Sequence, residues 1–192
     1  KNKVLLPYHM ASMNKIKPDT NAVDKWLSTY NSGSMITTKL DGVSGLYTTC
    51  GGQPQLYKHG DGKEGLDLSN LIKYFNLPPV TNACLRGEFV ISKSIFLEKY
   101  SDKFANARNL VAGILNRKHM DDRINDVDFV IYEVIEPSLK PFEQVKLLER
   151  FNTKYNTKIF SSFNISDTKL LTNTFLSNKL IVLSVEPSSE MI

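Results

Sequence analysis

The sequence predicts an α+β domain in which antiparallel sheets form the centre and helices flank them. Strand-like segments rich in β-branched and aromatic residues are interspersed with segments of helical periodicity. The Gly51-Gly52 pair between two such strands indicates a hairpin, which joins antiparallel neighbours. Hydrophobic residues make up 41% of the 192 residues, as in ordinary globular proteins. We therefore expect one domain over residues 1–192, with an irregular opening segment over 1–18.

Apolar residues at helical spacing and polar N-cap residues mark the helices. Residues 20–30 follow Asp19 or Thr20, and residues 106–118 are entered through Asn106. Further helices are expected at 69–75, capped by Asp67 or Ser69, at 94–100, capped by Ser94, and at 142–151 and 167–177.

Segments that favour extended backbone predict the strands at 35–40, 45–49, 55–58, 83–91, 127–135, 158–163 and 180–185.

Composition limits the functional classes. Cys50 and Cys84 have no metal-ligand spacing, which indicates free thiols in a reduced compartment. No apolar run is long enough to span a membrane, and the sequence from Lys1 onward lacks a signal peptide. We therefore expect the protein to be located in the cytoplasm, at a nucleoid or at a viral replication site, and not to be secreted. The net charge of +4 permits a polyanionic partner without requiring one.

The stretch Lys39-Leu40-Asp41-Gly42 follows a short strand pattern and has two interpretations. Alternation along an extended strand would place Thr37, Lys39 and Asp41 on one face. A lysine amine in a partly dry cleft, or near a second cation, loses its proton and becomes a nucleophile. The alternative is an edge-strand lysine paired with Asp41 and followed by a turn glycine. The tetrapeptide alone favours this alternative, because Lys-x-Asp-Gly is short and arises by chance.

Four further segments carry candidate site residues. Several glycines in the run 59–69 indicate a loop that bends or approaches a ligand closely. Arg86 and Glu88, with a glycine between them, place two opposite charges inside an apolar strand. Such charges either form a cross-strand ion pair or face a ligand. Arg108 lies in a helical first turn, where the macrodipole disfavours a cation, so it needs a phosphate or a carboxylate partner. Tyr132 is either core packing or an aromatic platform for a base.

Together these segments resemble the adenylation (nucleotidyltransferase) domain of NAD-dependent DNA ligases. Lys39-Leu40-Asp41-Gly42 resembles the nucleotidyl-lysine motif, and residues 59–67 resemble the Arg-Gly-Asp-Gly-x-x-Gly-x-Asp loop. Residues 86–89, Arg-Gly-Glu-Phe, resemble the third motif, and 104–113 resemble Phe-Ala-Asn-Pro-Arg-Asn-x-x-Ala-Gly. Residues 129–132 resemble the strand that bears a stacking aromatic. The five matches keep the family's order and spacing, so the resemblance implies the nucleotidyltransferase fold, which is ATP-grasp-like.

The resemblance implies that Lys39 attacks the α-phosphorus of NAD, with Asp41 as a second catalytic residue. AMP would then pass to the 5′-phosphate of nicked double-stranded DNA, and the 3′-hydroxyl would displace it. Mg²⁺ together with Arg86 or Arg108 would neutralise phosphate oxygens. Glu88 would hold a ribose hydroxyl, and Tyr132 would stack on adenine. Ser12 and Met13 would line the adenosine pocket. The other residues expected to contact NAD or AMP are Thr37, Leu40 and His59.

The chain departs from the family pattern at three positions. Thr37 stands where a glutamate usually reads the adenine amino group, although a hydroxyl still accepts a hydrogen bond. His59 replaces the loop arginine, and Asn116 replaces an arginine, with Arg117 one step further along the helix. Adenine recognition is therefore expected to be weaker or shared.

The sequence ends before the family's Asp-Gly-Val-Val-Ile-Lys motif, so we expect a truncated domain, a fragment or one subunit of a split ligase with a second chain. Two other functions remain open. One is an ATP- or GTP-dependent nucleotidyltransferase, such as an RNA ligase or capping enzyme. The other is a degenerate, non-catalytic module that binds nucleotide or DNA.

Overall fold

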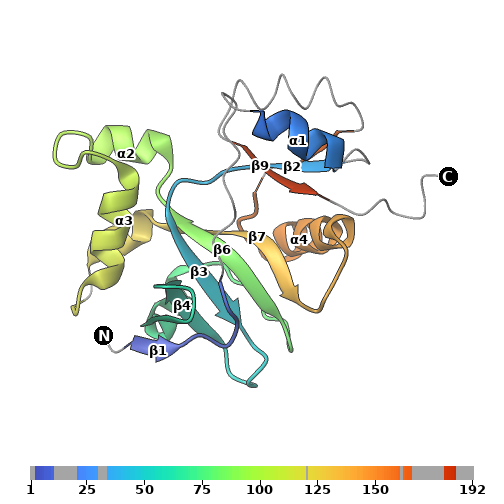
Figure 1. Cartoon of the computed structure of the whole chain (residues 1–192). Coiled ribbons are helices and arrows are strands. Elements are labelled where there is room, and N and C mark those ends of the chain that lie inside the picture. Colours follow the sequence, from blue (N-terminus) through green and yellow to red (C-terminus); the bar gives the residue numbers. More distant parts are fainter. Residues whose placement is uncertain are drawn as a thin grey trace.

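The computed structural model describes residues 3–10, 21–29, 34–119, 121–160, 162–165 and 180–184. Its main body is a six-stranded antiparallel sheet with helices packed against it (Figure 1), which confirms the predicted α+β class. The strand order across this sheet is β1-β5-β4-β3-β6-β7. The strands are β1 (Lys3–Leu5), β3 (Val43–Thr48), β4 (Gln55–His59), β5 (Glu64–Asp67), β6 (Cys84–Val90) and β7 (Asp128–Glu136).

The predicted hairpin joins β3 to β4. The Gly52 backbone N–H donates to the Thr49 carbonyl oxygen at 3.1 Å, and Gly52 has a φ of 84°, a conformation that glycine adopts without strain. Strand β3 then pairs with β4 on one side and β6 on the other. A β-carbon at Gly45 would lie 2.4 Å from the Phe89 ring, so only glycine fits at this point of β3.

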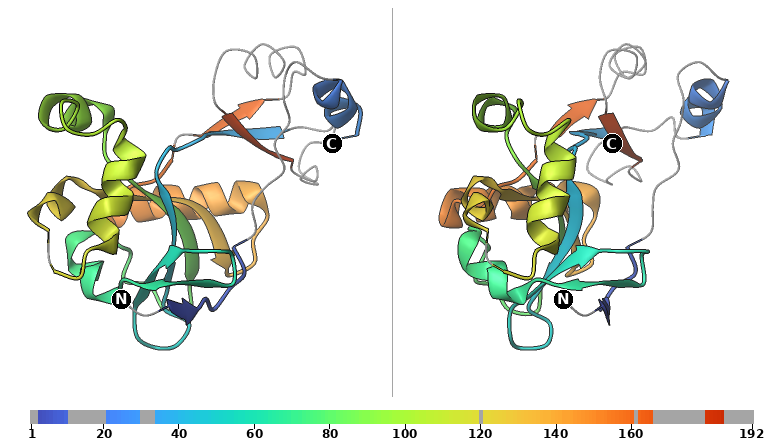
Figure 2. Two further views of the ribbon diagram at one scale, coloured as in Figure 1. Left: turned by 60° about the vertical axis from the view of Figure 1, so that its left-hand side comes forward. Right: turned by 90° about the vertical axis from the view of Figure 1, so that its left-hand side faces the viewer.

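A second sheet has three strands in the order β8-β2-β9: β2 (Ser34–Thr38), β8 (Ser162–Ile165) and β9 (Leu180–Ser184). Figure 2 shows it at one end of the main body, with the chain running from β2 directly into β3. The helix α1 (Ala22–Thr29) lies nearby (Figure 1). Pairing of β2 with β9 ends at Thr38, so the predicted strand 35–40 is two residues too long. Lys39 therefore follows the strand and does not belong to it.

The main core lies between the large sheet and its helices. The rings of Phe75, Phe89 and Phe129 contact one another there, with centroid separations of 4.6 to 6.3 Å. The helix α3 (Ala107–Asn116) packs against β3 and β6, and α4 (Pro141–Tyr155) packs against β7. The apolar stripe predicted for α3 is buried as expected: Leu110, Val111, Ile114 and Leu115.

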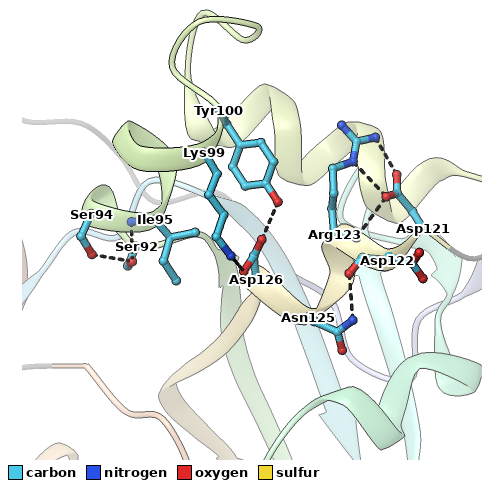
Figure 3. Close-up of polar contacts among 10 residues, drawn as sticks. All are labelled: Ser92, Ser94, Ile95, Lys99, Tyr100, Asp121, Asp122, Arg123, Asn125 and Asp126. Atoms are coloured by element: carbon cyan, nitrogen blue, oxygen red, sulfur yellow. Dashed lines mark hydrogen bonds and ion pairs between the residues drawn. The ribbon is translucent and has the colours of Figure 1, made fainter.

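A polar cluster fastens the helix α2 (Lys93–Lys99) to the short 3-10 helix η2 (Asp122–Asp126). Figure 3 shows the Asp126 carboxylate between the Tyr100 hydroxyl, which donates to it, and the Lys99 ammonium at 2.8 Å. The α2 N-cap is Ser92, whose hydroxyl oxygen accepts from the Ile95 N–H at 3.3 Å. The prediction of Ser94 as the cap is therefore wrong, because the helix begins at Lys93 and Ser94 already lies within it.

The opposite face of the large sheet carries a smaller apolar cluster. Met10, Leu46, Tyr57 and Cys84 are buried there, and the segment 3–10 packs over them. Strand β1 begins this segment and pairs with β5, although the sequence predicted no element before residue 18. Arg86 and Glu88 lie on this face, because they alternate along β6 with the core residues Leu85 and Phe89.

Several other predictions are confirmed or modified. The segment from Ser69 to Tyr74 is a 3-10 helix, η1, and not an α-helix. Helix α4 is longer than predicted and ends where Asn156 adopts a φ of 53°. Both cysteines are free thiols. Within the described ranges, no helix is long and apolar enough to cross a membrane. The proposed caps Asp19 and Thr20 and the expected helix 167–177 lie outside the described residues.

Candidate active site

The segment from Lys39 to Gly42 turns directly against β6. Lys39 and Asp41 are exposed, whereas Gly42 is buried. A β-carbon at Gly42 would lie 2.0 Å from the Phe89 carbonyl oxygen and 3.0 Å from Glu88 Cγ. The turn can therefore approach β6 this closely only because residue 42 has no side chain. This close approach places the backbone just after Lys39 beside Glu88.

Arg108 connects helix α3 to this turn. Its Nε donates to the Gly42 carbonyl oxygen at 2.6 Å, and its Nη1 lies 3.9 Å from Asp41 Oδ1. Arg108 projects from the first turn of α3, which Asn106 caps by accepting from the Asn109 N–H at 2.8 Å, as predicted. The expected negative partner of Arg108 is thus Asp41. Among the described residues, Asp41 pairs with Arg108 and not with Lys39 as first suggested.

Glu88 is a buried carboxyl group at the centre of the site, with 5% of its surface exposed. Ser44 faces it across the β3–β6 pairing, and the Ser44 hydroxyl donates to Glu88 Oε2 at 2.8 Å. Burial raises the pKa of Glu88. The Ser44 hydrogen bond, the positive charges of Lys39 and Arg108, and the Gly42 N–H oppose this rise. These opposing effects also show that Lys39 and Arg108 lie close enough to act on the carboxylate.

Tyr132 completes this group from the neighbouring strand β7. Burial raises the pKa of its hydroxyl, and the negative charge of Glu88 raises it further. The nearby Ser44 hydroxyl opposes this rise in pKa. Tyr132 therefore lies beside both Ser44 and Glu88. Its side chain is only partly buried, so it could present a ring to a ligand.

Arg86 is held by a cross-strand ion pair. Its Nη1 lies 2.8 Å from Glu133 Oε2, the residue opposite it on β7, and its Nη2 donates to the His9 carbonyl oxygen at 3.3 Å. The ion-pair interpretation of Arg86 is thus confirmed. Its Nε is buried and has no hydrogen-bond partner among the described residues. The Arg86 Nε–H is therefore a hydrogen-bond donor without a partner among the described residues, and it lies on the same face of β6 as Glu88.

The glycine-rich loop folds back on the segment before residue 11. His59 Nε2 lies 3.1 Å from the Met10 carbonyl oxygen, and the Met10 N–H donates to the Gly62 carbonyl oxygen at 2.9 Å. Asp61 Oδ1 accepts from the N–H groups of Lys63 and Glu64, and these bonds lower the pKa of Asp61. The loop is therefore a fixed turn, and part of it, β5, is a strand that the sequence did not predict.

The structure brings most of the predicted site residues together in two adjoining groups. Lys39, Asp41, Glu88, Arg108 and Tyr132 surround the turn at Gly42, whereas Arg86 and His59 meet the segment 3–10. Thr37 is buried in β2, and Leu40 is half-buried beside Lys39. Ser12 and Met13 lie outside the described residues. Sequence analysis missed Ser44, and its place opposite Glu88 becomes visible only once the strand register is known.

The two polar residues near the end of α3 are already engaged. Asn116 Oδ1 accepts from Lys58 Nζ at 2.6 Å, and burial lowers the pKa of Lys58. Arg117 Nε lies 3.2 Å from Asp121 Oδ2. Asn116, which replaces an arginine of the family pattern, therefore serves here as the acceptor for a lysine.

The described residues do not include a cluster of side chains that could bind a metal ion. Within the part of the chain that the structure describes, no group of three or more His, Cys, Asp or Glu side chains could hold an ion. Mg²⁺ characteristically keeps several waters and binds substrate phosphates with one or two carboxylates. The described side chains therefore do not form a dedicated Mg²⁺ site.

Comparison with known proteins relates this arrangement to a family. No family model matches the chain. It is 41% identical over 176 residues to a DNA ligase of Acanthamoeba polyphaga mimivirus, an alignment that covers 85% of the chain and 27% of that ligase. It is 33% identical over 190 residues to the putative DNA ligase 205R of Invertebrate iridescent virus 6, covering 92% of the chain and 30% of that protein. The chain is thus a relative of viral DNA ligases along most of its length.

This DNA ligase relative spans less than a third of the length of these two viral proteins. A solved Lig E DNA ligase shares its fold, with a TM-score of 0.52 and 15% identity over 80% of this chain and 56% of that one. The predicted fold, the nucleotidyltransferase fold of DNA ligases, is thereby confirmed. The predicted roles of individual site residues remain predictions.

Proposed function

We propose that this DNA ligase relative transfers adenylate from NAD to Lys39 and then to the 5′-phosphate at a DNA nick. The observation that supports this most strongly is the convergence of Lys39, Arg108 and Glu88 on the turn at Gly42. A nucleophile, a guanidinium and a buried carboxylate are the groups needed to attack a phosphate, balance its charge and hold a sugar. Phosphoryl transfer depends mainly on such positioning and charge neutralisation.

Lys39 supplies the nucleophile in this proposal. Its Nζ forms a bond to the α-phosphorus of NAD while the bond to the departing nicotinamide mononucleotide breaks. The amine gives up its proton, and the adenylate remains on Lys39 as a phosphoramidate. Because Lys39 is exposed, nucleotide can reach it. The adenylate then passes to the 5′-phosphate, which frees Lys39, and the 3′-hydroxyl of the nick displaces AMP and seals the strand.

Arg108, Glu88 and Tyr132 hold the nucleotide in this proposal. The Arg108 side chain is 54% exposed while its Nε is fixed on Gly42, so its remaining N–H groups can donate to a phosphate without loss of this anchor. The Glu88 carboxylate accepts a hydrogen bond from a ribose hydroxyl, and the Tyr132 ring stacks on adenine. Thr37 lies two residues before Lys39 in β2, where its hydroxyl could contact the adenine.

The choice of NAD rests on the family resemblance of the glycine-rich loop and of the segment 104–113. Bound phosphates would bring Mg²⁺ with them, and the ion would further neutralise their charge. Nicked double-stranded DNA is the proposed acceptor, and the net charge of +4 is compatible with it.

The test is to incubate the chain with adenine-labelled NAD, ATP or GTP and to separate the products on a denaturing gel. Acid-labile label from NAD that is lost in Lys39→Ala and in Lys39→Arg supports the proposal. Lys39→Arg is the sharper control, because it retains a positive charge but removes the nucleophile. Label from ATP or GTP supports an RNA-ligase or capping type of enzyme. Absence of label from every donor supports a non-catalytic module.

Strand sealing requires a separate assay, because the relatives are more than three times as long as the aligned part of this chain. Pre-formed adenylylated nicked DNA, in which the AMP is already attached to the 5′-phosphate, isolates the last step. Transfer to Lys39 without sealing would support the adenylation role and would separate it from ligation.

A further inference from the structure

Ser44 occupies a position that the mechanism so far does not use. It lies on β3 directly opposite Glu88 on β6, and its hydroxyl donates to Glu88 Oε2 at 2.8 Å. The two residues lie at the centre of the large sheet, where both strands have neighbours on each side. Their separation is therefore set by the strand register and not by a flexible loop.

The Glu88 carboxylate needs this kind of support. It is 5% exposed, and a buried carboxylate is stable only when donors satisfy its oxygens. The groups that face it are Ser44 from β3, Lys39 and the Gly42 N–H from the turn after β2, Arg108 from α3, and Tyr132 from β7. Of these, only Ser44 forms a side-chain hydrogen bond with Glu88 among the described residues.

Tyr132 lies near the same carboxylate. The negative charge of Glu88 raises the pKa of the Tyr132 hydroxyl, so the two side chains are neighbours. A fixed Glu88 carboxylate therefore also defines the space beside the Tyr132 ring.

We propose that Ser44 is a positioning residue that holds the Glu88 carboxylate in the geometry that binds the nucleoside part of the nucleotide. A carboxylate has about four lone-pair sites. The Ser44 hydroxyl occupies one of them and leaves others for a ribose hydroxyl. The inference rests on the proposed function, since it assigns a role in binding the same nucleotide.

Three variants test this role. Ser44→Ala removes the hydroxyl, Ser44→Thr retains it, and Ser44→Cys keeps the volume but offers a weaker donor. Ser94→Ala is the matched control, because Ser94 is an exposed serine on α2. Adenylate transfer is measured against NAD concentration, and the Glu88 carboxyl carbon is titrated by ¹³C NMR, with Glu88→Gln used to assign its signal.

We expect Ser44→Ala to raise the KM for NAD about tenfold, the effect of losing one hydrogen bond to a charged group, with a smaller change in kcat. The pKa of Glu88 should rise further in this variant, because one of the contacts that lowers it is gone. Ser44→Thr should resemble the unaltered chain, Ser44→Cys should lie between the two, and Ser94→Ala should change neither quantity.

The inference is overturned if folded Ser44→Ala keeps the KM and the Glu88 pKa of the unaltered chain, or if Ser44→Thr is as impaired as Ser44→Ala. Should Ser44→Ala fail to fold, the comparison of Ser44→Cys with Ser44→Thr decides instead. If the unaltered chain accepts adenylate from no donor, the proposed function fails. In that case the titration of Glu88 still shows whether Ser44 controls this carboxyl group.

Discussion

Arg108 donates from Nε to the Gly42 carbonyl oxygen at 2.6 Å, across 66 residues of sequence. This bond joins the first turn of α3 to the backbone three residues after Lys39. The planar guanidinium of arginine can form this hydrogen bond through Nε and still direct its Nη N–H groups at another acceptor. The ammonium of lysine lacks this planar arrangement of donors. The candidate phosphate-binding cation is therefore tied to the backbone of the Lys39–Gly42 segment before any nucleotide binds.

Replacing Arg108 should impair adenylate transfer more than folding. Arg108→Lys keeps the charge but loses the fork, so we expect at least a tenfold lower rate of Lys39 labelling. The side chain is 54% exposed, so the free energy of unfolding should change by less than about 1 kcal/mol. Arg117→Lys is the control, because Arg117 is 60% exposed and is also paired with an aspartate. Equal labelling by Arg108→Lys and the unaltered chain would exclude this role for the guanidinium.

Two glycines should respond in opposite ways to the same substitution. A β-carbon at Gly42 would overlap the Phe89 carbonyl oxygen, so Gly42→Ala must push the turn away from β6. We expect it to cost about 1 to 3 kcal/mol of stability and to abolish labelling. Gly113 is inside α3, and a β-carbon there would meet nothing within 4 Å. Gly113→Ala should therefore stabilise the fold by about 0.5 to 1 kcal/mol. Urea denaturation measures both, and a similar shift in the two variants would contradict the geometry.

Glu88 should lower the stability of the fold at neutral pH. Its pKa in the folded state is raised above 4.5, so folding favours its protonated form. The stabilisation from Glu88 is present at low pH and is lost as the pH rises through the folded-state pKa. Glu88→Gln, which is always neutral, should therefore unfold at higher urea concentration than the unaltered chain at pH 7. The difference should vanish below about pH 4, while labelling is lost at every pH.

Asp126 should show the opposite pH dependence. Hydrogen bonds from Lys99 and Tyr100 lower its pKa below 3.8, so its contribution to stability is present above that value and is lost as the pH falls through the folded-state pKa (Figure 3). Asp126→Asn should unfold at lower urea concentration at pH 7 and should match the unaltered chain in strong acid. Because this cluster joins α2 to η2, labelling of Lys39 should remain. A parallel pH dependence for Asp126→Asn and Glu88→Gln would refute the two assignments.

Local features of the fold were predictable from the sequence, whereas its long-range pairings were not. Asn106 caps α3 through a bond three residues away, so sequence suffices to find it. Strand β1 has only three residues, and its partner β5 is about 60 residues distant, so no local pattern marks either. Strand β2 stops at Thr38 because its partner β9 begins at Leu180, which the spacing of residues near Lys39 does not reveal.

The candidate site shows the same division. The family resemblance pointed to Lys39, Glu88 and Arg108. The macrodipole argument required a phosphate or a carboxylate partner for Arg108, and the structure shows Asp41 beside it. The pairing of Arg86 with Glu133 was foreseen as a type of contact but not as a particular pair. Ser44 was missed because a serine within a strand gives no signal until the register places it opposite Glu88.

The central claim is that Lys39 becomes the adenylate carrier, and peptide mass spectrometry tests it most directly. The chain is incubated with NAD alone, digested under conditions that preserve a phosphoramidate, and searched for the mass of one added adenylate. We predict that this mass occurs on the peptide containing Lys39, that it disappears in Lys39→Arg, and that it persists in the control Arg117→Lys. Adenylate on another residue, or none from NAD while ATP or GTP gives an adduct, would contradict the account.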